Sequence, residues 1–98
     1  MKVVLLHAFP LGPEMWAPQR GALEGHEVLA PNLYELEGNS IDGWAEQIWD
    51  GFDDDFAAVG LSMGGYVALA LARLAGERSR GLFLAGARPA RSEEDAVP

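Results

Sequence analysis

One stretch of the chain constrains the fold more than any other, because a strand-like run leads straight into a helical pattern there. The apolar residues 56–59 are followed by Gly-Leu-Ser-Met-Gly at residues 60–64, and an alanine- and leucine-rich helical pattern then covers residues 64–74 until Gly76. A strand that turns directly into a helix is the first part of a β-α-β unit, in which the next strand runs parallel to the first. The apolar residues 82–85 supply that next strand.

The same alternation of strand-like and helical segments extends over the rest of the chain. Further strands are expected at residues 3–6 and 27–30, helices at residues 18–23 and 41–49, and loops at residues 7–13 and 32–39. Ser40 can cap the second of these helices, and Gly51 can end it. Alternating strands and helices predict an α/β fold with three α/β/α layers, in which a mostly parallel sheet of about four strands is covered by helices on both faces.

Charge and composition exclude several classes of function. The formal net charge is −8, and no Lys or Arg occurs between Arg20 and Arg73. Such a chain repels phosphate backbones and anionic lipid, so we expect no nucleic-acid partner and no membrane partner. Without cysteine there is no disulfide scaffold or thiolate metal site, and the aspartates at residues 53–55 lack the spaced ligands of a calcium loop. We expect no metal, no cofactor, no signal peptide and a cytoplasmic location.

Ser62 is the candidate nucleophile, because the strand–turn–helix setting is that of a nucleophile elbow, a sharp turn that exposes a serine hydroxyl. Gly60 and Gly64 lack the Cβ atoms that would collide where the strand and the helix pass closely. The first N–H groups of a helix have no intrahelical acceptor, so the Met63 N–H can point to the position of an oxyanion. The positive end of the helix dipole adds to this effect.

A second signal follows the first expected strand, where the sequence reads His-Ala-Phe-Pro at residues 7–10. An acyl-transfer site needs a second N–H donor for the oxyanion, and a loop after a neighbouring strand can supply it. Phe9 N–H is the candidate donor. Pro10 has no N–H but restricts the loop, and Ala8 is small enough for a tight turn. His7 is interpreted as a residue that organises this loop, because it lies beside the expected oxyanion hole and not opposite the serine.

The motifs at residues 7–11 and 60–65, together with Val-Leu-Ala-Pro-Asn-Leu at residues 28–33, resemble those of the α/β-hydrolase superfamily. The resemblance covers most of residues 2–86 and implies strands 3 to 6 of the family sheet, in the spatial order 4-3-5-6. The Phe9 loop and the Ser62 elbow would then meet at the carboxyl edge of the sheet, where ligands bind in open α/β sheets.

Two positions depart from the family pattern. Ala8 stands where the family usually has glycine, and Asn32 stands where an aspartate is common. Alanine still permits a tight loop, and the position of Asn32 is not catalytic in the family.

The acid and the base of the family's triad are a larger gap. The family order is nucleophile, acid, histidine, but no histidine follows Ser62. His7 and His26 both precede the serine, and His26 is expected at the surface, at the remote end of a strand. The acidic residues Glu93, Glu94 and Asp95 lie in the tail, and none of them is assigned as the triad acid. The resemblance therefore implies a single partial domain, residues 1–98, that is inactive alone.

The leading functional interpretation is a carboxylesterase- or lactonase-like serine hydrolase that acts on a small ester or thioester through an acyl-enzyme on Ser62. One alternative is a non-catalytic ligand-binding protein or pseudoenzyme, and another is a cofactor-free acyltransferase or haloperoxidase. Dehalogenases and epoxide hydrolases fit less well, since those relatives carry aspartate at the nucleophile position. The expected strand at residues 82–85 would have an unpaired apolar edge, which predicts self-association.

Overall fold

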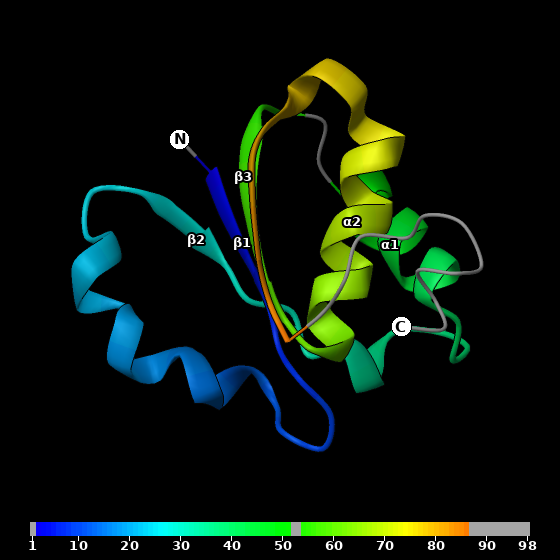
Figure 1. The fold of residues 1–98 in the computed structure, drawn as a ribbon, viewed down its shortest axis with the longest axis horizontal. Helices are drawn as coiled ribbons and strands as arrows, with labels where there is room; N and C mark the ends of the chain where they lie inside the picture. Colours follow the sequence, from blue (N-terminus) through cyan, green and yellow to red (C-terminus); the bar gives the residue numbers. More distant parts are fainter. Residues whose placement is uncertain (1, 52–53, 87–98) are drawn as a thin grey trace.

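The structure is a computed structural model that describes residues 2–51 and 54–86. In these residues four parallel strands form one sheet: β1 (Lys2–Leu6), β2 (Glu27–Leu29), β3 (Phe56–Leu61) and β4 (Ser79–Ala85). The spatial order is β2-β1-β3-β4, which confirms the order expected from the resemblance. Figure 1 views this sheet nearly edge-on. The loops that follow β1 and β3 consequently lie side by side at the carboxyl edge of the sheet.

Strand β4 is longer than its apolar pattern predicts. It begins at Ser79 and pairs with β3 from Phe56 to Leu61. Pairing at Ser79 and Gly81, with a shift of register between them, therefore extends the strand over residues that an apolar pattern leaves out. The strand lies at one edge of the sheet, and its self-association stays a prediction.

Two α-helices cover one face of the sheet, α1 (Ile41–Asp50) and α2 (Met63–Ala75). Both agree closely with expectation, and Ser40 Oγ accepts a hydrogen bond from Gly43 N at 3.0 Å as the cap of α1. Alternate strand residues point to this side, because successive side chains of a strand face opposite ways. These strand residues, the buried residues of the two helices and Leu33 form the larger core. Its members are Val4, Leu6, Phe56, Ala58, Trp44, Ala45, Ile48, Val67, Ala68, Ala70, Leu71 and Leu33.

The opposite face carries a segment whose helical structure differs from the expectation. The loop is confirmed at residues 7–12, but the single helix expected at residues 18–23 is replaced by two 3₁₀ helices, η1 (Pro13–Gln19) and η2 (Gly21–Leu23). Pro13 can begin a helix, because an N–H at the first helical position would have no intrahelical acceptor and its absence costs no hydrogen bond. Pro18, however, cannot donate the bond that a continuous α-helix would require.

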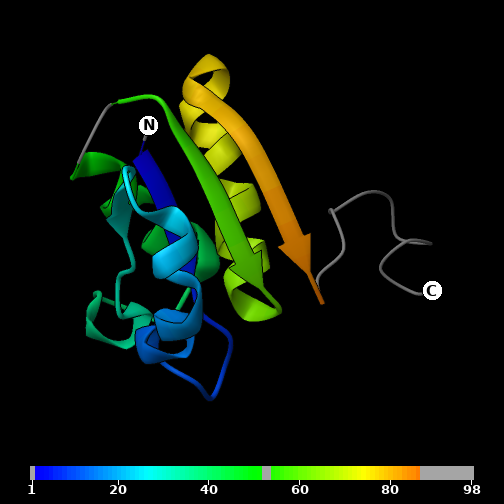
Figure 2. The same cartoon turned by 90° about the vertical axis from the view of Figure 1, so that its left-hand side faces the viewer.

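The 3₁₀ segment covers only part of this second face. Trp16 packs on Val3 and Leu5 of β1, and Figure 2 shows the segment in front of β1 and β2. No described helix lies in front of β3 and β4 in this view. Phe83 of β4 is accordingly 63% exposed.

A further 3₁₀ turn, η3 (Leu33–Glu35), lies within the expected loop after β2. It begins at Asn32, whose side chain caps it by accepting from Tyr34 N. Among the described helices, none is both long enough and apolar enough to span a bilayer. The cytoplasmic location stays a prediction.

Candidate active site

Ser62 makes the turn between β3 and α2 by itself. Its φ of 56° and ψ of −115° make it the only non-glycine residue with positive φ among residues 2–51 and 54–86. Such a conformation costs roughly 1–3 kcal/mol and persists only where the surroundings impose it. Here Ser62 N donates to Ala85 O at 2.7 Å, and Ser62 O accepts from Gly65 N at 2.9 Å. The side chain is exposed at the carboxyl edge of the sheet.

Two glycines allow the elbow to pack against its neighbours. A Cβ atom on Gly60 would overlap the Gly64 carbonyl and lie 2.6 Å from the Gly65 Cα. A Cβ atom on Gly64 would overlap the carbonyl oxygen of Leu6 and lie 2.6 Å from that of His7. The first turn of α2 therefore lies directly on the end of β1, so the elbow and the loop after β1 are in contact.

His7 begins that loop and is fully buried. Its Nε2 accepts from Leu33 N at 2.9 Å, and its Nδ1 lies 3.1 Å from Ala8 O. These partners assign the tautomer with hydrogen on Nδ1, because the amide can only donate and the carbonyl can only accept. Both ring nitrogens are thus occupied, and neither can serve as a base for Ser62.

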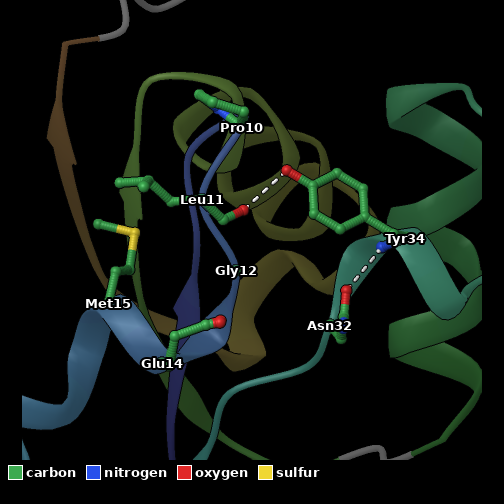
Figure 3. Close-up of a pocket in the computed structure, with 7 residues that line it drawn as sticks. All are labelled: Pro10, Leu11, Gly12, Glu14, Met15, Asn32 and Tyr34. Atoms are coloured by element: carbon green, nitrogen blue, oxygen red, sulfur yellow. Dashed lines mark hydrogen bonds between the residues drawn. The ribbon is translucent and has the colours of Figure 1, made fainter.

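The rest of the loop is more open. Phe9 is 68% exposed and Leu11 is 49% exposed, while Ala8 is buried and its N–H faces Met15 Sδ at 3.4 Å. The Phe9–Pro10 peptide bond is cis. Loop residues and η1 border a cavity of about 410 Å³, whose lining is drawn in Figure 3: Pro10, Leu11, Gly12, Glu14, Met15, Asn32 and Tyr34.

Tyr34 is a residue of this site that sequence reasoning missed. Its hydroxyl donates to Leu11 O at 2.7 Å, and its ring centroid lies 4.9 Å from that of His7 (Figure 3). The one signal in the sequence is its position just after the second strand, because parallel neighbouring strands bring their following loops to the same edge. Local pattern alone does not connect residues 34 and 11.

Of the other candidates, only His26 belongs to the part of the chain that the structure describes, and it lies away from Ser62. His26 is exposed and precedes β2, at the amino edge of the sheet, which is opposite to the edge that carries Ser62. Glu93, Glu94 and Asp95 lie outside the described residues. Within the described ranges no group of three or more His, Asp or Glu side chains could hold a metal ion.

The chain resembles proteins of known class along nearly its whole length. Residues 3–98 match the model of the Alpha/beta hydrolase family. The pimeloyl-[acyl-carrier protein] methyl ester esterase of Aromatoleum aromaticum is 33% identical over 105 residues, which cover 98% of this chain. The chain spans only 42% of that protein's length.

Solved structures agree with this match. A thermophilic esterase from Thermogutta terrifontis, with malate bound, superposes with a TM-score of 0.76 at 33% identity and covers 99% of this chain and 41% of its own. An extracellular α/β-hydrolase from a Paenibacillus species gives a TM-score of 0.71 at 20% identity, over 86% of this chain and 39% of its own, which is a likeness of fold. By its sequence and by its sheet, the chain belongs to the α/β-hydrolase family.

Proposed function

We propose that this chain supplies the nucleophile and the oxyanion hole of a serine-dependent carboxylic ester hydrolase that acts on a small ester or thioester. The observation that carries the proposal is the backbone of Ser62, which turns with φ of 56° between β3 and the first turn of α2. This turn leaves the hydroxyl exposed beside a helix N-terminus. Two relatives at 33% identity are named as esterases, which supports the choice of an ester substrate.

The chemistry proceeds in two stages. Ser62 Oγ attacks the carbonyl carbon while a general base takes its proton, and the carbonyl electrons move onto oxygen. The N–H groups of Phe9 and Met63 donate to that oxyanion. When the carbonyl re-forms, the bond to the alcohol breaks and the alkoxide takes the proton from the base. Water then attacks the acyl group on Ser62, with the same base accepting and returning a proton, and releases the acid.

No described residue can serve as the general base for Ser62. His7 has both ring nitrogens occupied, and His26 lies at the opposite edge of the sheet. The family places its acid and its histidine after the nucleophile, and the relatives are more than twice as long as this chain. We therefore propose that residues 1–98 form a partial hydrolase domain that does not turn over ester alone. The same observation favours, as a second candidate, a binding protein without catalysis.

Labelling of Ser62 separates the two candidates. In the protein expressed from its own gene in its source organism, a fluorophosphonate probe should modify Ser62, and Ser62→Ala should abolish both labelling and p-nitrophenyl acetate turnover. The loss should reach several orders of magnitude, as removal of the nucleophile does in other serine hydrolases. Ser79→Ala, at the amino end of β4, is the matched control and should label like the wild type.

Three results would contradict parts of the proposed function. Labelling that persists in Ser62→Ala excludes this serine from the mechanism. Absence of labelling in a folded wild-type protein favours the binding protein. Turnover of ester by the isolated 98-residue chain through Ser62 would contradict the assignment of a partial domain.

A further inference from the structure

The segment after β2 holds the loop after β1 at two points. Leu33 N donates to His7 Nε2 at 2.9 Å, and the Tyr34 hydroxyl donates to Leu11 O at 2.7 Å. Phe9 lies midway between these points, two residues after His7 and two residues before Leu11. Both chain directions from Phe9 are thus fastened to the same pair of adjacent residues.

Tyr34 also contacts two aromatic rings of the loop. Its centroid lies 4.9 Å from the His7 ring and 6.3 Å from the Phe9 ring, which it meets edge-on. Asn32 Oδ1 accepts from Tyr34 N at 3.1 Å and so fixes the backbone from which the tyrosine projects (Figure 3). The Tyr34 side chain is therefore held at its own base while it holds the loop.

On its far side the loop continues into η1, where Met15 N donates to Gly12 O at 3.1 Å. Between these points packing restrains the loop weakly, because Phe9 is 68% exposed and Leu11 is 49% exposed. His7, by contrast, is fully buried and fixes the start of the loop. The Tyr34 hydroxyl consequently ties the exposed half of the loop to the segment after β2.

We propose that Tyr34 is a positioning residue that sets the orientation of the Phe9 N–H through the carbonyl of Leu11. The catalytic part of this inference rests on the proposed function, since Phe9 N–H is the proposed second oxyanion donor. Tyr34 touches no reacting atom and acts only through the loop. An oxyanion donor is effective when it is held in place before the reaction, and a misplacement of about 1 Å can cost roughly 10²-fold in rate.

Tyr34→Phe tests the proposal, because it keeps the ring and removes only the hydroxyl. Hydrogen exchange at the amides of residues 8, 9, 11 and 12 should become about 2- to 10-fold faster, which corresponds to the loss of one hydrogen bond. In the protein expressed from its own gene, kcat for p-nitrophenyl acetate should fall about 10-fold while KM stays unchanged, because the donor acts on the transition state. Thermal melting checks that the fold is intact.

Tyr66→Phe is the matched control. Tyr66 lies on α2 and is 43% exposed, against 45% for Tyr34. Equal exchange in wild type and Tyr34→Phe, or the same acceleration in Tyr66→Phe, would show that the Tyr34 hydroxyl does not hold the loop. Faster exchange with an unchanged kcat would overturn the positioning role.

The two proposals fail in different ways. If Ser62→Ala labels and turns over like the wild type, the proposed function fails. The exchange measurement on residues 8–12 does not depend on catalysis, so it still decides whether Tyr34 holds the loop.

Discussion

The two proposed oxyanion donors are held by different kinds of interaction. On the elbow, the Met63 amide is placed by the main chain, through the bond from Ser62 N to Ala85 O and through the close packing of Gly64 on β1. On the loop, the Phe9 amide is placed by side chains. His7 and Tyr34 bridge from the loop to the segment after β2.

Because of this difference, we expect substitutions at the elbow to change mainly the stability of the protein and substitutions in the loop to change mainly its activity. The elbow cannot move unless β3, α2 or the end of β1 moves with it, so a change there acts on the whole core. The loop can shift when one side chain is altered, so a change there acts on the donor first. Rigid elements hold a site more precisely than loops do, and loops need supporting contacts of their own.

Phe9→Pro tests the loop most directly, and we expect it to reduce turnover more than any other substitution in the loop. Proline removes the proposed donor, and turnover should fall by about 10²–10³-fold, the cost of one oxyanion donor in other enzymes. Ester kinetics measure this loss, and circular dichroism checks that the variant is folded. Full activity in a folded variant would show that Phe9 N–H is not a donor.

Gly64→Ala breaks the elbow half. The added methyl would overlap main-chain carbonyls of Leu6 and His7, which cannot rotate away, so the free energy of unfolding should fall by about 3 kcal/mol, at the upper end of overpacking costs. Chemical denaturation measures the change. Gly21→Ala is the matched control, because a Cβ atom there meets nothing within 4 Å. Equal stability of the two variants would contradict the packing that we describe.

His7→Ala sharpens the comparison, since His7 belongs to the loop but is buried like the core. Its removal leaves the buried Leu33 N–H without its acceptor, and this should cost about 1–3 kcal/mol of unfolding free energy. His26→Ala, an exposed histidine, should change the melting temperature little. If both variants melt alike, His7 does not anchor the loop.

The sequence was sufficient to predict the sheet and the elbow. Strand order follows from the family resemblance, and the positions of Gly60, Ser62 and Gly64 follow from a local pattern in which each residue type has a steric reason. The apolar spacing of the helix at residues 41–49 also agrees with the packing, since Trp44 is buried in the core and Trp49 packs against it. Local chemistry of this kind is readable because the residues that interact are close in the sequence.

The features that could not be predicted depend on contacts between residues distant in the sequence or on the way in which the backbone folds around prolines. Tyr34 and Leu11 are 23 positions apart, and nothing near either residue indicates the bond between them. Two 3₁₀ helices replace the single helix expected at residues 18–23, because prolines at positions 13 and 18 interrupt the regular pattern from which a helix is predicted. The roles of Ser62, Phe9 and Met63 in catalysis stay predictions until the labelling and kinetic experiments are done.

The bond from Ser62 N to Ala85 O has a mechanical consequence. Ala85 is the last residue of β4, so the end of this edge strand is anchored on the residue that carries the proposed nucleophile. Tension applied to the chain beyond β4 would load this bond before it reached most of the β3–β4 ladder. The serine would then respond to force at the sheet edge, and stretching a single molecule from that side would report on the geometry of the elbow.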